Sequence, residues 1–258
     1  MKSNGAAPRA VLLDFGGVLV DVIGRPSGVR EVAEDVHALL RREHCALGFD
    51  RIERDVRAGW QAYHDWKAAE GRRAAPREMA HREFWGELVA ADWPERARAV
   101  VERDADHLCE RIDVATKDRP VKADSAGTLR ALHQRGIRCV LVSNALSGSG
   151  SRQLVREHGL EPFLAAQVYS DEQRVRKPNP EIFRIAARQI GVDLAECWYV
   201  GDQIDRDVLG GRRAAVGRVL LLPSSSTGTG NDAIAEPDAV IECPSDVLGL
   251  LPARTEAR

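Results

Sequence analysis

The sequence predicts an α/β protein: a Rossmann-like parallel sheet with helices on both faces and an all-helical domain inserted after the first strand. Short apolar runs typical of buried strands lie at residues 11–13, 137–142, 166–169, 197–200 and 218–222. From the second run onward they alternate with segments of helical periodicity, the pattern of a parallel sheet covered on both faces. Residues 24–118 contain no clear strand, and their apolar side chains recur at helical spacings.

The strand runs end at polar residues. Asp14 follows the first run, Ser143 the second, and Asp202 the fourth. Ligands of parallel sheets bind at the carboxyl ends of the strands, so we expect these side chains to share one edge. Ile182, Phe183, Ala186 and Ile190 mark the inner face of a helix, and the tail over residues 238–251 predicts a last short strand and a closing helix.

The inserted segment shows three apolar stripes. Their members are Val29, Val32, Val36, Leu39 and Leu40; Ile52, Val56, Trp60 and Tyr63; and Val101, Ala105, Leu108 and Ile112. Phe84, Trp85 and Leu88 lie between the second and third stripes, and together these residues predict about four helices. The predicted domains are a catalytic core over residues 1–23 and 119–258 and a helical domain over 24–118, which lies beside the catalytic edge and can act as a lid.

Composition narrows the classes of function. The 258 residues carry a net charge of −2, with no basic excess of the kind that binds nucleic acid. No apolar stretch is long enough to cross a membrane. The five cysteines show no paired or metal-binding spacing. We therefore predict a cytoplasmic protein with a small-molecule partner, no nucleic-acid partner and no membrane contact.

Asp14 is the first candidate catalytic residue. A carboxylate at a strand end can attack an electrophile, while the amides of the loop at Gly16 and Gly17 hold phosphoryl oxygens. The alternative for this strand-Asp-Gly-Gly pattern is an ordinary turn.

Two further segments offer polar groups to the same edge. Ser143 and Asn144 could bind a phosphoryl oxygen, or could simply form a turn or helix cap. Lys177 precedes Pro178, and Pro180 can start a helix, so the lysine is held in an extended segment at a helix entrance. Its ammonium could neutralise both a nucleophile and a transferring group, whereas a solvated surface lysine is the alternative.

The segment 201–207 is rich in carboxylates. Asp202, Asp205 and Asp207 follow the strand run within a few residues of one another. Gathering carboxylates is costly without a cation, and oxygen ligands with open water positions suit Mg²⁺. The alternative is a helix N-terminus with acidic residues in its first turn.

Taken together, these motifs resemble the haloacid dehalogenase superfamily, most of whose members are Mg²⁺-dependent phosphatases. The four motifs occur in order over residues 14–19, 143–144, 177–183 and 201–217, and the match covers residues 9–22 and 119–251. The helical insert falls at the position of that family's type-1 cap domain.

The resemblance implies a role for each motif residue. Asp14 would be the nucleophile that forms an aspartyl-phosphate, and Lys177 would be the charge clamp. The implied phosphate site consists of Gly16, Gly17, Ser143, Asn144 and Lys177. The implied Mg²⁺ site consists of Asp14, the Gly16 carbonyl and Asp202. Asp207 would orient the metal site, and Asp205 could fill part of this acidic role instead.

One position departs from the family pattern. Phosphatases of the family usually carry a second aspartate two residues after the nucleophile as general acid and base, and here that residue is Gly16. Such assistance is typically worth about 10²–10⁴-fold in rate. A cap side chain, an ordered water or a good leaving group could compensate, and some phosphatase-like relatives carry glycine here.

The sequence leaves alternatives open. The chain could be a catalytically weak or inactive ligand-binding relative, or a dehalogenase, although the acidic fourth motif favours the metal-dependent branch. It could also be a phosphonatase using Lys67 as a Schiff-base lysine. The favoured prediction is hydrolysis of a small phosphorylated metabolite. One helical face carries Trp60, Tyr63, His64 and Lys67. These side chains could be presented to the cleft, or they could pack within the insert. Neither the substrate nor the oligomeric state is predicted.

Overall fold

The computed structural model describes residues 7–225, 227 and 235–252. A six-stranded sheet runs in the order β5-β4-β1-β6-β7-β8, and every neighbouring pair is parallel. Its strands are β1 Ala10–Leu13, β4 Arg138–Ser143, β5 Leu164–Tyr169, β6 Cys197–Gly201, β7 Arg218–Leu221 and β8 Ala239–Val240. The predicted parallel α/β sheet is confirmed, including the short strand in the tail.

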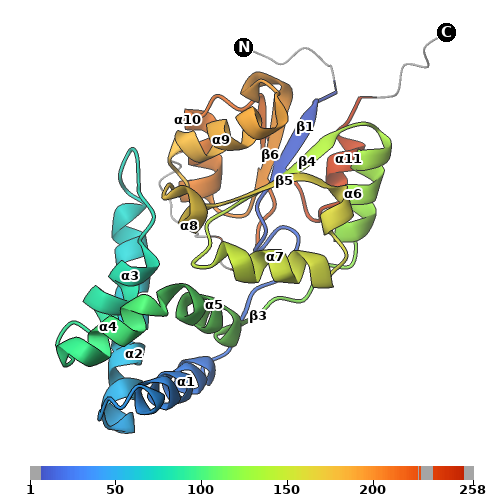
Figure 1. Cartoon of the computed structure of the whole chain (residues 1–258). Helices are drawn as coiled ribbons and strands as arrows, with labels where there is room; N and C mark the ends of the chain where they lie inside the picture. The colour runs from blue at the N-terminus through green and yellow to red at the C-terminus, as the bar shows by residue number, and fades with distance from the viewer. Residues whose placement is uncertain (1–6, 226, 228–234, 253–258) are drawn as a thin grey trace.

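Helices cover both faces of this sheet, as Figure 1 shows with α9 and α10 on one side and α6 and α11 on the other. The α-helices of this part are α6 Ser125–Gln134, α7 Gly148–Glu157, α8 Ser170–Gln173, α9 Pro180–Ile190, α10 Leu209–Arg213 and α11 Asp246–Gly249. Shorter 3-10 or π turns are η2 Glu161–Phe163, η3 Leu194–Glu196 and η4 Ile204–Val208.

The apolar strands are buried on both faces because side chains alternate along a strand. In β1, Val11 and Leu13 point to the core cluster under α6 and α11, whereas Ala10 and Leu12 point to the cluster under α9. All four are at most 1% exposed. The central position of β1 places the residue that follows it, Asp14, at the middle of the sheet edge.

The insert between β1 and β4 is helical and has its own apolar core. Its elements are α1 Gly28–Arg42, α2 Phe49–Glu70, α3 His81–Glu83, the π-helix η1 Phe84–Val89, α4 Glu95–Arg103 and α5 Ala105–Ala115. In Figure 1 this helical group lies apart from the sheet, with α5 nearest to α7. None of the helices among the described residues combines the length and apolar character that a membrane crossing requires.

Two details of the insert differ from the prediction. The third apolar stripe, from Val101 to Ile112, belongs to two helices, because α4 ends at Arg103 and α5 starts at Ala105. The second difference is a strand pair where none was expected: β2 Ile23–Gly24 and β3 Lys117–Asp118 are antiparallel, where the chain leaves the core and returns. Strands of two residues are too short to produce an alternating pattern.

A loop of the insert is fastened to the core through a buried ion pair. Glu78 Oε1 lies 3.1 Å from Arg176 Nη1, and Glu78 Oε2 accepts a hydrogen bond of 2.6 Å from the Ser170 hydroxyl. The side chains of Glu78 and Arg176 are 2% and 7% exposed. Backbone pairing between Arg77 and Val175 extends the same contact.

We expect Glu78→Ala to lower the free energy of unfolding by about 3–5 kcal/mol, because it leaves the Arg176 guanidinium buried without its partner. Urea unfolding followed by circular dichroism measures this loss. As a matched control, Glu34→Ala removes an exposed i,i+4 pair with Arg30, which is worth about 0–1 kcal/mol. Equal losses in the two variants would contradict the assigned role of Glu78.

Candidate active site

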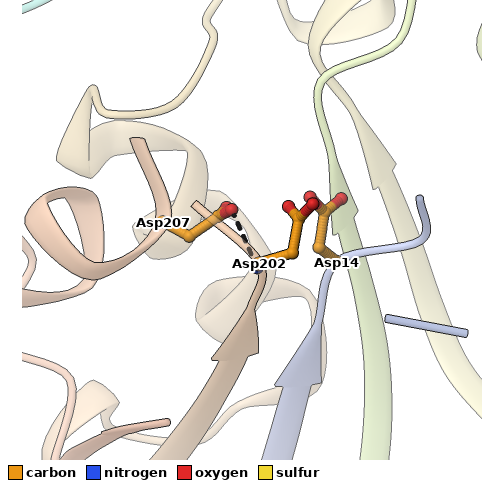
Figure 2. Close-up of side chains that lie close together, drawn as sticks. All are labelled: Asp14, Asp202 and Asp207. Atoms are coloured by element: carbon orange, nitrogen blue, oxygen red, sulfur yellow. Dashed lines mark hydrogen bonds between the residues drawn. The ribbon is translucent and has the colours of Figure 1, made fainter. Parts of the chain in front are cut away.

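Three carboxylates meet at the carboxyl edge of the sheet. Asp14 follows β1, Asp202 follows β6, and Asp207 lies in η4. One oxygen of each lies within 4.8 Å of the others. Figure 2 shows the Asp14 and Asp202 carboxylates side by side above the ends of their strands, with Asp207 joined to the backbone of Asp202. The three residues are 3%, 1% and 0% exposed.

Lys177 lies between two of these carboxylates. Its Nζ is 2.8 Å from Asp14 Oδ2 and 2.7 Å from Asp207 Oδ1, and it donates to the Tyr199 hydroxyl at 2.9 Å. An ammonium has three protons, so every donor of this fully buried group has an acceptor. The surface-lysine alternative is therefore wrong.

The backbone at Lys177 is fixed by Asn144. The Asn144 side chain accepts from the Lys177 backbone N–H at 2.8 Å and donates to the Lys177 carbonyl at 3.1 Å. Asn179 caps α9 by accepting from Glu181 N, and Pro180 is the first residue of that helix. Lys177 thus lies at a helix entrance, as the two prolines predict. Asn144 lines the cavity, but its side-chain amide is bound to Lys177.

Asp207 is satisfied by protein donors. Its Oδ1 accepts from Lys177 and from the Tyr199 hydroxyl at 2.6 Å, and its Oδ2 accepts from the backbone N–H groups of Asp202 and Gln203 at 3.2 and 3.0 Å. Burial alone would raise the pKa of Asp207, but the Lys177 ammonium and the other donors hold that pKa well below its usual range. Asp207 is therefore an ionised group that orients Lys177 and the loop after β6.

Asp14 has fewer donors. Its Oδ1 accepts from the Phe15 N–H at 2.7 Å, and its Oδ2 faces Lys177. Burial raises the pKa of Asp14; Lys177 opposes this, and the neighbouring Asp207 and Asp202 carboxylates add to it. The site thus has less positive charge than its carboxylates require, as expected of a site that takes a further cation.

Arg206 is a site residue that the sequence analysis missed. Its Nη2 lies 3.0 Å from Asp202 Oδ1 and 3.8 Å from Asp14 Oδ2, and its Nε lies 3.5 Å from Asp207 Oδ2. The signal was present, because an arginine four residues after Asp202 in a helical turn can reach back to it. Tyr199 was also missed, since it lies inside the apolar run of β6.

The remaining predicted site residues lie around the same point. Gly17 has φ of +77°, and a Cβ there would lie 2.3 Å from Asp202 Oδ2, so only glycine lets the loop approach Asp202. Ser143 ends β4 and lines the cavity. Asp205 also lines the cavity but is exposed and lies outside the three-carboxylate cluster among the described residues, whereas Asp207 lies inside it.

The site opens into a cavity of about 480 Å³ between the sheet edge and the insert. The cavity is lined from the core by Asp14, Ser143, Lys177 and Asp202. It is lined from α2 by Tyr63, His64 and Lys67, and from β3 by Lys117. Asp14 and Asp202 supply the anionic oxygens that a hard divalent cation such as Mg²⁺ prefers. Their donor set fits such an ion. Lys177 contacts Asp14, and Arg206 lies near both carboxylates.

Comparison with known proteins is consistent with this geometry. The model of the haloacid dehalogenase-like hydrolase family matches residues 8–215. The chain is 31% identical to a phosphoserine phosphatase of Thermus thermophilus over 79% of this chain and 80% of that protein. It is 39% identical to a glyceraldehyde 3-phosphate phosphatase of Methanopyrus kandleri over 36% of this chain, and that match spans only 40% of the relative.

Solved structures extend the similarity in fold. A 2-haloacid dehalogenase from Pseudomonas syringae superposes with a TM-score of 0.61 and 17% identity, covering 95% of this chain and 98% of that one. At this identity the likeness concerns the fold alone. The parallel sheet with its helical insert is thus a known architecture.

Proposed function

The chain belongs to the haloacid dehalogenase-like hydrolases, and from this we propose that it is a Mg²⁺-dependent phosphatase acting on a small phosphorylated metabolite through an aspartyl-phosphate at Asp14. Relatives named as phosphatases of small metabolites support the reaction class. The observation that carries the proposal is the buried contact of 2.8 Å between Asp14 Oδ2 and Lys177 Nζ, beside Asp202 and inside a cavity.

In the first half-reaction, an Asp14 carboxylate oxygen attacks the phosphorus atom. The bond from phosphorus to the ester oxygen breaks, and its electron pair leaves with the alcohol. The Phe15 N–H orients Asp14, while the Lys177 ammonium compensates the charge that builds up on the transferring group. The Ser143 hydroxyl and the Gly16 N–H bind the phosphoryl oxygens, whereas the Gly17 N–H donates to the Val20 carbonyl at 2.8 Å and does not take part.

In the second half-reaction, water attacks the phosphorus atom of the aspartyl-phosphate, and one of its protons passes to a phosphoryl oxygen or to solvent. The bond between phosphorus and the Asp14 oxygen breaks, which releases inorganic phosphate and restores the carboxylate. Asp207 keeps Lys177 in place through both steps, because its own oxygens are held by Tyr199 and the backbone.

The proposed Mg²⁺ site consists of the Asp14 and Asp202 carboxylates with the Gly16 carbonyl. When bound there, Mg²⁺ would supply positive charge to the phosphoryl oxygens and to the otherwise under-compensated carboxylates. Asp207 lies beside this site and orients it. Lys177 would supply the positive charge on the other side of the Asp14 carboxylate.

Two residues after Asp14, Gly16 has no carboxyl group that could protonate the leaving group. Asp113 in the cavity cannot supply this proton, since both of its oxygens are bound, by Lys117 and by Arg119. Substrates whose leaving groups need little protonation are therefore favoured.

The experiment for this proposal is phosphate release by the purified protein from p-nitrophenyl phosphate and from a panel of phosphorylated metabolites. Each assay is run with Mg²⁺ and with excess chelator. We expect release with Mg²⁺ that the chelator abolishes. Absence of release across the panel would favour the ligand-binding interpretation, whereas halide release from 2-haloacids, or phosphonate cleavage, would favour the other hydrolase branches.

Arg206→Gln is expected to bind Mg²⁺ about 3–10-fold more tightly than the unaltered protein. A guanidinium 3.0 Å from Asp202 opposes a second cation, and solvent screening of this partly exposed group keeps the effect below the full Coulomb value. Isothermal titration with Mg²⁺ measures the affinity without any turnover. Arg184→Gln, on the exposed face of α9, is the control, and unchanged or weaker binding in Arg206→Gln would contradict the competition.

A further inference from the structure

Helix α2 presents two polar groups to the cavity from one face. Tyr63 and Lys67 are four residues apart, so they lie on successive turns of the same side of the helix. Both line the cavity that contains Asp14 and Lys177. The phosphoryl chemistry described above uses neither of them.

Neither polar group is paired with a polar or charged side chain in the part of the chain that the structure describes. Within the described ranges, no hydrogen bond or ion pair reaches the Tyr63 hydroxyl or the Lys67 ammonium. Tyr63 is only 2% exposed, and it lines the cavity, so its hydroxyl is accessible to a ligand from the cavity. Lys67 Nζ lies over the ring of Tyr63, 4.6 Å from its centroid.

The tyrosine is held rigidly. Its ring stacks on Trp66 at a centroid distance of 6.0 Å and packs edge-on against Phe84 at 5.6 Å. A hydroxyl fixed in this way pays little entropy when it binds a ligand. The unpartnered hydroxyl is therefore a preorganised donor.

Positive charge predominates on this side of the cavity. Asp113 is shared by two cations, Lys117 at 2.9 Å and Arg119 at 2.7 Å. Arg176 is paired with Glu78. The single charge of Asp113 balances only one of its two cations, so this group of side chains has a surplus of two positive charges, one of which is on Lys67. The pKa of His64 is lowered to about 4 by burial and by the nearby Lys67 and Lys117, so this imidazole is neutral near pH 7 and adds no charge.

The pKa of Lys67 reflects its burial and the surrounding positive charge. Burial, with the neighbouring Lys117 and Arg176, lowers the pKa of Lys67 to about 7. An anionic group bound at its Nζ would reverse this shift, because an opposite charge favours the ammonium form.

We propose that Tyr63 and Lys67 bind a second anionic group of the substrate, so that this phosphatase acts on phosphorylated carboxylic acids. The inference rests on the proposed phosphatase function, since Asp14 and Lys177 receive the phosphoryl group. A carboxylate has two oxygens, which match one ammonium and one hydroxyl donor. The same cavity is lined by Asp14 and Lys177, which receive the phosphoryl group, and by Tyr63 and Lys67, which would bind the carboxylate.

The test compares matched ligands that differ in one carboxylate: phosphoglycolate against ethyl phosphate, and phosphoglycerate against glycerol phosphate. Affinities are measured by isothermal titration on the Asp14→Asn protein, which cannot turn the ligands over. We expect the carboxylate to improve binding by about 10–100-fold, the value of a hydrogen-bonded ion pair. A lack of preference in both pairs would overturn the proposal.

Variants of Lys67 and Tyr63 test whether these two residues produce the preference for a carboxylate. In the Asp14→Asn background, Lys67→Met is expected to reduce the preference to less than about 3-fold, Tyr63→Phe to reduce it in part, and Lys67→Arg to keep most of it. Arg54→Met, an exposed charge on the same helix, should leave it unchanged. A preference that survives Lys67→Met would overturn the assignment. A borohydride-stable adduct of Lys67 with a carbonyl-bearing phosphonate would also overturn it, because the adduct would show that this lysine forms a Schiff base.

Failure here is distinguishable from failure of the phosphatase proposal. Hydrolysis of p-nitrophenyl phosphate, which has no carboxylate, tests the reaction at Asp14. The titrations test only which ligands bind, in a protein that does not react. A protein that hydrolyses the aryl phosphate but shows no carboxylate preference would retain the first proposal and lose the second.

Discussion

Asp14→Asn is expected to reduce Mg²⁺-dependent phosphate release from p-nitrophenyl phosphate by about 10⁴-fold or more. The amide cannot form the acyl-phosphate bond, so the variant loses the covalent route altogether. The substitution keeps the shape of the side chain, and removing one of three clustered carboxylates relieves repulsion. We therefore expect the thermal unfolding temperature to be unchanged or raised.

The matched control is Asp92→Asn, which alters an exposed aspartate of the insert and should retain full activity. Rates are compared at saturating Mg²⁺, so that a weakened metal site is not mistaken for a lost nucleophile. Equal rates in Asp14→Asn and the unaltered protein would rule out Asp14 as the nucleophile.

Lys177→Met is expected to have the second large effect, on activity and on stability together. It removes the cation that touches both Asp14 and Asp207. We expect activity to fall by about 10³-fold or more, since the electrostatic compensation of the transferring group is lost. We also expect a loss of about 3–5 kcal/mol in the free energy of unfolding, because two buried carboxylates lose their partner.

The pH dependence of this loss has a definite sign. Asp207 has a lowered pKa in the folded protein, so its contribution to stability is present above the unfolded pKa of about 3.9 and is lost as the pH falls further. The deficit of Lys177→Met should be full near neutral pH and shrink below about pH 4. Urea titrations across this range measure it. Adding Asp207→Asn to Lys177→Met should recover part of the lost stability. A Lys177→Met single variant as stable as the unaltered protein at neutral pH would contradict the account.

Much of the fold could be predicted from the sequence because the information is local. The strands are contiguous apolar runs, and each ends at a polar residue, so Asp14, Ser143 and Asp202 could be assigned to one edge before the topology was known. The prolines around Lys177 predicted its place at the start of α9. The domain limits at residues 23/24 and 118/119, and the cytoplasmic location, stay predictions.

What the sequence analysis missed depends on contacts between distant segments. The Tyr199 hydroxyl reaches Lys177 from within an apolar strand, so the pattern that identified β6 also concealed its polar group. Arg206 lies between Asp205 and Asp207, and the carboxylates of this segment predicted a metal site without indicating a contact for the arginine. Glu78 lies in a loop after α2 and meets Arg176 almost a hundred positions later, and no local pattern indicates such a pair.

Phosphoryl transfer through a covalent intermediate on Asp14 is tested most directly by the stereochemical course at phosphorus. The course is followed with an aryl thiophosphate that is made chiral by oxygen isotopes and hydrolysed in isotopically labelled water. Each in-line displacement inverts the configuration, so two successive displacements, first by Asp14 and then by water, predict net retention. Net inversion would show a single direct attack by water and would contradict the account.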